Sequence, residues 1–164
     1  MKQIVFNDPF NKKRVQSLDF DQMICIENIF KIQCSENSAE NIINKEIIEF
    51  VKEMTKLLKQ KFSSYKSQDK QSHKFDPVQH ITYEQMIEKI YVSKLKCYYC
   101  CCELSIIYNR KRLKSQWTLE RLNNNLGHYD TNTCICCLDC NLKRRTENHE
   151  YFKKSKQTII KLER

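Results

Sequence analysis

Two pairs of cysteines have the residue type and the spacing of metal ligands. Cys97 and Cys100 form the first pair, Cys137 and Cys140 form the second, and two residues separate the members of each. Such a pair presents two thiolates from one tight turn, and two pairs a few dozen residues apart are typical of a tetrahedral structural zinc site. The alternative, buried thiols in an ordinary core, explains single cysteines better than two pairs at this spacing. We therefore expect one structural zinc ion.

The identity of the second pair has one alternative. Cys134 and Cys137 also stand two residues apart. The segment 133–136 predicts a short strand, and a ligand pair is best placed where a strand gives way to a helix. We therefore favour Cys137 with Cys140 and keep Cys134 with Cys137 as the alternative.

Cysteine usage also bears on where the protein acts. The chain has 164 residues and ten cysteines, of which eight lie between Cys97 and Cys140, several of them adjacent. Adjacent cysteines suit thiols better than a spread disulfide framework. The N-terminal segment has no apolar signal-peptide region, and no run approaches the roughly 18 apolar residues of a membrane span. We expect an intracellular protein of the cytoplasm or the nucleus.

The positive charge is concentrated in the half that carries the cysteine pairs. The formal net charge is +9; residues 1–90 hold fourteen basic and thirteen acidic residues, and residues 91–164 hold fifteen and seven. A basic region around a small zinc fold is typical of nucleic-acid binding, because neutralising phosphates releases counterions. A solubilising surface would explain scattered charge, but not two basic clusters beside the motif. The predicted backbone contacts are Arg110, Lys111, Arg112, Lys143, Arg144 and Arg145.

The apolar pattern predicts an α+β protein with a helical N-terminal region. Residues 39–62 place apolar side chains on one helical face, which packs in a core or binds a second copy or another protein. A shorter helix is expected within residues 14–33, and the Ser-, Lys- and Gln-rich stretch 63–80 predicts a linker. The chain is thus divided into a helical region (1–62), a linker (63–80) and a zinc-bearing domain (81–164).

Three local signals surround the cysteine motif. Thr82 and Gln85 have the spacing of a capping box, which predicts a helix running to about Lys94. Gly127 is the only glycine of the chain, and we expect it in a turn that needs a positive φ. Trp117 is expected to pack under the predicted hairpin, with stacking on a base as the alternative.

Further residues stand in a fixed order between and after the cysteine pairs. The first pair is followed by a predicted strand that ends in Glu120, then by Gly127 and Asn132, and the second pair is followed by Asn141 and Lys143. This order resembles the zinc-bearing HNH endonucleases, also called ββα-metal or His-Me finger nucleases, over about residues 82–145. The resemblance implies that a two-stranded hairpin and a helix hold one divalent cation against the scissile phosphate.

The resemblance also implies a role for each matching residue. Glu120 corresponds to the acidic metal ligand, Asn141 to the metal ligand early in the helix, and Asn132 to the asparagine that fixes the loop. Carboxylate and amide oxygens suit Mg²⁺ or Mn²⁺. The thiolates would hold structural zinc, and this second cation would be catalytic.

One position departs from the family's pattern. Arg121 stands where the general-base histidine is usual, and it remains protonated, so it cannot accept a proton from water. We expect Arg121 to clamp a phosphate oxygen instead. His128 is the candidate base, or else a loop histidine that touches phosphate or solvent. His149 is a weaker candidate, whereas His73 and His80 are expected to be solvated.

The expected function is metal-dependent hydrolysis of phosphodiester bonds in DNA, with RNA as the other substrate. The rival expectation is a zinc-bearing nucleic-acid-binding module without catalysis, which Arg121 at the base position favours.

Overall fold

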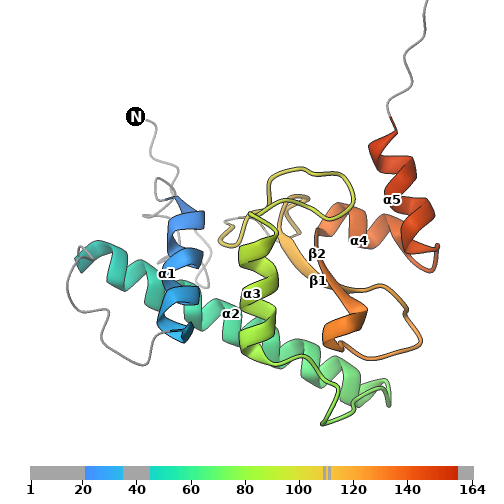
Figure 1. The fold of residues 1–164 in the computed structure, drawn as a ribbon, viewed down its shortest axis with the longest axis horizontal. Helices are drawn as coiled ribbons and strands as arrows, with labels where there is room; N and C mark the ends of the chain where they lie inside the picture. Colours follow the sequence, from blue (N-terminus) through green and yellow to red (C-terminus); the bar gives the residue numbers. More distant parts are fainter. Residues whose placement is uncertain (1–20, 35–44, 109, 111, 159–164) are drawn as a thin grey trace, which may run out of the picture.

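The computed structural model of the protein describes residues 21–34, 45–108, 110 and 112–158. Within these residues the chain forms helices and one small antiparallel sheet, which confirms the α+β class (Figure 1). The elements are α1 (Gln22–Cys34), α2 (Lys45–Gln71), α3 (Tyr83–Val92), β1 (Trp117–Arg121), the 3-10 turn η1 (Asp130–Asn132), β2 (Thr133–Cys137), α4 (Leu138–Arg144) and α5 (His149–Gln157).

Helix α2 is the long support on which the other elements rest, and it passes beneath α1, α3 and the strands (Figure 1). Its inward face buries Met54 and Leu58 completely and Tyr65 almost completely. The sequence predicted that this helix ends at Phe62 and that a linker follows, but the helix continues to Gln71. The inward face continues with it, because Tyr65 and the fully buried Asp69 follow Leu58 at helical spacing. The predicted start at residue 39 lies outside the described residues.

Helices α1 and α3 close one side of the core. Cys25, Ile26 and Ile29 of α1 are buried, and Phe30 stacks on Tyr91 of α3 with ring centroids 4.6 Å apart. The helix expected within residues 14–33 corresponds to α1, although residues 1–20 lie outside the described part of the chain.

The capping box predicted at the start of α3 is confirmed. Thr82 accepts a hydrogen bond from the amide of Gln85, and the Gln85 side chain accepts one from the amide of Thr82. Two of the orphan amides at the helix start are thereby satisfied. The helix ends at Val92, two residues before the predicted end.

Strands β1 and β2 pair antiparallel, with Leu119 opposite Ile135 and Glu120 opposite Cys134. The strand predicted at 133–136 is therefore confirmed as β2. Successive side chains of a strand point to opposite faces, so Glu120 lies on one face of β1 and Trp117 on the other. The Glu120 face is covered by α4, and the Trp117 face is covered by α2.

Lys61 of α2 binds the face of the hairpin that carries Trp117. Its ammonium group donates to the carbonyl of Trp117 and lies 4.2 Å from the centroid of the indole ring. Trp117 is 2% exposed, so it packs under the hairpin as predicted. Among the described residues, no helix is both long enough and apolar enough to cross a membrane.

Candidate metal centre and strand-helix site

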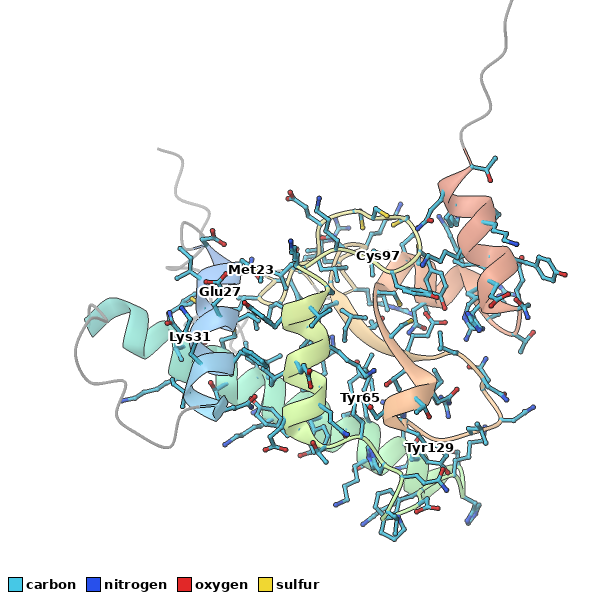
Figure 2. The ribbon with its side chains drawn as sticks, viewed as in Figure 1. Met23, Glu27, Lys31, Tyr65, Cys97 and Tyr129 are labelled. Atoms are coloured by element: carbon cyan, nitrogen blue, oxygen red, sulfur yellow. The ribbon has the colours of Figure 1, made fainter. Side chains whose placement is uncertain are left out.

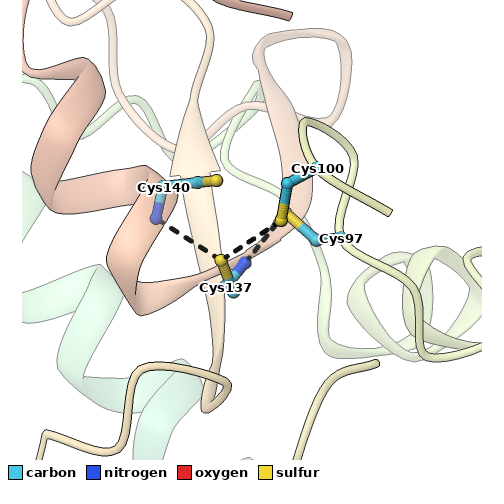
Figure 3. A group of neighbouring side chains, drawn as sticks. All are labelled: Cys97, Cys100, Cys137 and Cys140. Carbon is cyan, nitrogen blue, oxygen red and sulfur yellow. Dashed lines mark hydrogen bonds between the residues drawn. The ribbon is translucent and has the colours of Figure 1, made fainter. Parts of the chain in front are cut away.

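Four cysteine sulfurs meet where the segment after α3 lies against the end of β2 and the start of α4 (Figure 3). The Sγ atoms of Cys97, Cys100, Cys137 and Cys140 all lie within 4.8 Å of one another. Four thiolates around one zinc ion at about 2.3 Å would stand about 3.8 Å apart, and the sulfurs of Cys100 and Cys137 are separated by 3.9 Å. The cluster could therefore hold a metal ion such as zinc, and it leaves Cys134 out.

The local fold explains how the two pairs converge. Cys137 ends β2 and is also the N-cap of α4, where its sulfur accepts from the amide of Cys140 at 3.4 Å. The amide of Cys137 donates to the sulfur of Cys97 at 3.3 Å, and this hydrogen bond links the first cysteine pair to the second. The predicted transition from strand to helix is thus what places the second pair.

The sulfurs perturb one another strongly. A hydrogen bond from the Cys137 thiol lowers the pKa of Cys97 to about 4, and the same bond raises the pKa of Cys137. Burial raises the pKa of Cys140 to about 12. A metal ion that binds these sulfurs would deprotonate the thiols that ligate it.

Glu120 lies in the interface between β1 and α4 and is 5% exposed. One carboxylate oxygen accepts from Nε of Arg144, and the other accepts from the thiol of Cys136 at 2.9 Å. Burial raises the pKa of Cys136, so this thiol keeps the proton that it donates. Both oxygens of the predicted metal ligand therefore already have a partner.

Asn141 reaches into the same interface from α4. Its amide nitrogen lies 3.2 Å from the hydroxyl of Thr118, which stands two residues before Glu120 on the same face of β1. The structure thus brings both predicted oxygen ligands to one strand-helix interface. Among the described residues, the cysteine cluster is the only group of three or more Cys, His, Asp or Glu ligands close enough to hold a metal.

Arg144 does not lie on the surface, contrary to the sequence prediction. It is 3% exposed, and besides Glu120 its guanidinium donates to the carbonyls of Arg121 and Glu147, both at 2.7 Å. It also donates to the Asn124 side chain at 3.1 Å. A guanidinium with five N–H donors suits this position, where several backbone carbonyls and one carboxylate need donors. Arg144 therefore joins β1, the loop after it and the turn before α5, and is not free to bind a phosphate.

The other predicted backbone contacts differ in their placement. Arg110, Arg112 and Arg145 are exposed. Lys143 is exposed and forms an ion pair with Asp139 at 2.7 Å, one helical turn away. Lys111 lies outside the described residues.

His128 lies on the opposite side of the hairpin from Glu120. It is 3% exposed, its Nδ1 lies 2.7 Å from Oδ1 of Asp69, and its amide donates to Oδ2 of Asp69 at 2.6 Å. Its ring packs 4.9 Å from the ring of Tyr65 on α2. The structure therefore does not bring the predicted base to the predicted metal ligands.

Electrostatics agree with a neutral His128. Burial lowers the pKa of His128 below its usual value, although Asp69 acts in the opposite direction. Arg121 approaches the same carboxylate, with 3.8 Å between its NH1 and Oδ1 of Asp69, and donates to the carbonyl of Leu126 at 3.4 Å. Its side chain is 24% exposed, which leaves part of the guanidinium open to an anion.

The loop between the strands is closed by Asn132. Its amide nitrogen donates to the carbonyls of Asn123 and Gly127 at 3.0 and 2.9 Å, and its oxygen accepts from the amide of Asn123 at 2.9 Å. The expectation of a positive φ at Gly127 is wrong. Glycine is needed there because a Cβ would lie 2.3 Å from the carbonyl oxygen of Lys74 and 2.9 Å from Asp69.

Two further histidines are partly or fully buried, and the prediction of a solvated side chain is wrong for His80. His80 is buried rather than solvated, and its Nδ1 lies 3.0 Å from the carbonyl of His128. His149 begins α5, two residues after the Glu147 carbonyl that Arg144 contacts, and its buried Nδ1 has no partner among the described residues.

Sequence reasoning missed Asp69 and Tyr65, which link α2 to the hairpin. The Tyr65 hydroxyl accepts from the amide of Leu119 at 2.9 Å, and Figure 2 labels Tyr65 where α2 passes beneath the strands. Both residues lie in the stretch predicted as a linker. Their spacing could have revealed them, because Tyr65 stands four residues after Lys61 and Asp69 stands eleven residues after Leu58. Both positions therefore continue the inward face of the predicted helix.

No family model, no curated protein and no solved structure matches this chain. A function must therefore be assigned from the geometry and the chemistry of the residues themselves.

Proposed function

We propose that the protein is a metal-dependent endonuclease that hydrolyses phosphodiester bonds in DNA, with a structural zinc ion at the four cysteines. The observation that carries this proposal is the convergence of Glu120 and Asn141 on one interface between a hairpin and the helix that comes after it. This is the arrangement that the resemblance to HNH nucleases implies for the catalytic cation.

Zinc is the best occupant of the cysteine cluster. Four thiolates in a tetrahedral set favour zinc among the common divalent ions, and they leave no open position for substrate. The ion would fasten the segment after α3 to the β2–α4 junction, and with it the interface that contains Glu120.

The engaged state of Glu120 still permits a second cation. A carboxylate offers about four lone-pair positions, and Arg144 and Cys136 use one on each oxygen. Mg²⁺ or Mn²⁺ could use the remaining positions together with Asn141, water and a phosphate oxygen. Such an ion would stabilise negative charge on the scissile phosphate.

We propose His149, the weaker candidate from the sequence, as the proton acceptor of the reaction. His149 is the described histidine nearest in the chain to Arg144, the partner of Glu120, and His128 is held against α2 on the other face. A general base contributes about 10²–10⁴-fold, so His149→Ala should reduce cleavage by that factor and His128→Ala should not do so at saturating substrate.

The decisive experiment is nicking of supercoiled plasmid by the zinc-loaded protein with Mg²⁺ or Mn²⁺ and with EDTA. We expect nicking that Asn141→Ala and Glu120→Gln abolish, while Glu147→Gln, an exposed control, keeps it. Zinc content and the far-ultraviolet circular dichroism of each variant separate loss of the site from loss of the fold.

A nucleic-acid-binding module without catalysis is the second candidate. The observation that favours it is that both Glu120 oxygens have protein partners. Binding of DNA without nicking in any divalent cation would decide for this module and against the endonuclease.

A further inference from the structure

The outward face of α2 carries a regular row of cations. Its members, which we call the lysine stripe, succeed one another in steps of three or four residues with Ser63 in the same row, so they share one side of the helix. All of them are exposed. The lysine stripe consists of Lys52, Lys56, Lys59, Lys66 and Lys70.

The lysine stripe has few acidic neighbours on α2 itself, although Glu84 of α3 lines a hollow together with Lys59. From Lys52 to Lys70, α2 contains two carboxylates, of which Glu53 is partly buried and Asp69 is fully buried against His128. Within the described part of the chain, no lysine of the stripe takes part in an ion pair. The exposed residues between them, which are serines and glutamines, add neutral hydrogen-bond donors.

The stripe continues toward the basic loop before β1. A shallow hollow of about 590 Å³ runs along Lys52, Lys56 and Lys59 to Gln60. Gln60 also lines a neighbouring hollow of about 240 Å³ together with Tyr108. Tyr108 stands two residues before the exposed Arg110, so the second hollow borders the segment predicted to contact phosphates.

We propose that the lysine stripe binds the phosphate backbone of duplex DNA. Eighteen residue steps at about 1.5 Å span about 27 Å, and that length matches roughly 8 base pairs at about 3.4 Å each. Evenly spaced charge of one sign suits a ligand with evenly spaced phosphates, and serine and glutamine are common partners of phosphate oxygens. The proposal rests on DNA as the substrate of the proposed function, but it does not require cleavage.

An anionic membrane is a poorer occupant of this surface. An amphipathic helix binds membranes by inserting its apolar face. The apolar face of α2 is already occupied, because Met54, Leu58 and Tyr65 are buried in the core.

The test compares two triple variants with the same net charge. Lys52→Gln, Lys59→Gln and Lys66→Gln neutralise the stripe, whereas Lys94→Gln, Lys154→Gln and Lys156→Gln remove three exposed charges after α3 and on α5, away from α2 (Figure 1). Fluorescence anisotropy of a duplex of about 20 base pairs gives Kd between roughly 50 and 200 mM salt. We expect the slope of log Kd against log salt to fall by about 0.9 for each phosphate that is no longer neutralised, and the control to keep the wild-type slope.

The outcomes separate this surface from the proposed catalysis. Equal slopes in the two triple variants would overturn the lysine stripe as a DNA surface, even if plasmid nicking is normal. A smaller slope in the stripe variant alone supports the proposal, whether or not the wild type nicks DNA. Loss of binding to phosphatidylserine vesicles, with an unchanged DNA slope, would reassign the stripe to membranes.

Discussion

At the residue scale, the burial of Arg144 determines its role. Its guanidinium joins Glu120 to three backbone carbonyls and a side-chain amide oxygen at a site that is almost closed to water. A buried ion pair adds modest net stability compared with apolar residues, but removing one partner leaves an uncompensated charge. Arg144 is therefore a structural residue, whatever chemistry Glu120 performs.

Replacing Arg144 should expose this dependence. We expect Arg144→Met to lower the free energy of unfolding by about 3–5 kcal/mol, because Glu120 remains buried without its partner. The exposed Arg145→Met is the matched control and should change it by less than about 0.5 kcal/mol. Urea unfolding checks both, and the double variant with Glu120→Gln should recover part of the loss. A neutral effect of Arg144→Met would contradict the buried ion pair.

His128 offers a test of local electrostatics. Its pKa is lowered by burial and raised by Asp69, with burial the larger effect. The unfolded chain therefore binds a proton at a higher pH than the folded one. Stability should fall as pH drops through about 6.5 toward the folded-state value.

The two causes can be separated by NMR titration of the imidazole. The midpoint for His128 should lie below the ordinary value of about 6.5, and Asp69→Asn should lower it further because the attraction of the carboxylate is removed. A midpoint that rises in Asp69→Asn would show that the assigned cause is wrong.

At the scale of elements, the sequence predicted what depends on local spacing. The capping box at Thr82, the strand 133–136 and the two cysteine pairs were predicted because each is specified within a few residues. The end of α2 was missed because Ser63–Gln71 is polar by composition. Its helical state depends on Tyr65 and Asp69, whose partners lie 54 and 59 residues away in the chain.

The candidate site was predicted only in part for the same reason. The period of a strand places Glu120 and Thr118 on one face, but no local pattern says that Arg144 covers them. Likewise, His128 was assigned to the chemistry from its position near Gly127. Its partner Asp69 stands on an element that the motif does not include.

The contact between α2 and β1 can be tested by removing the hydroxyl oxygen of Tyr65. Tyr65→Phe removes the hydroxyl that accepts from the buried amide of Leu119, and an unsatisfied buried donor costs about 1–3 kcal/mol. Tyr151→Phe on the exposed face of α5 is the control and should be close to neutral. Thermal unfolding of the two variants measures the difference. Equal melting temperatures would mean that α2 does not hold the strand in this way.

At the scale of the whole molecule, we expect a metal ion at the four cysteines to stabilise the C-terminal half. The hairpin has two strands and α4 has seven residues, and elements this small do not bury enough apolar surface to fold alone. Structural zinc contributes about 10–16 kcal/mol in small zinc-binding peptides. Loss of the ion should therefore unfold the hairpin and α4 together.

Chelation of the metal and two matched cysteine substitutions test this expectation. Cys137→Ser should lose the bound metal and most of the thermal stability, whereas Cys102→Ser, an exposed cysteine beside the first pair, should keep both. Elemental analysis and circular dichroism before and after chelation provide the measurements. A Cys137→Ser protein with full metal content and an unchanged melting temperature would rule out the assigned ligands.

The separation in sequence between Asp69 and His128 has a consequence in time. A ribosome adds about 5–20 residues per second, so the 59 residues between them take about 3–12 s to synthesise. During that interval the inward face of α2 has emerged while the hairpin that covers its C-terminal part does not yet exist. Until the loop that contains His128 has been synthesised, Tyr65 and Asp69 of the nascent chain therefore face water or a chaperone. They can be covered only after that loop is available.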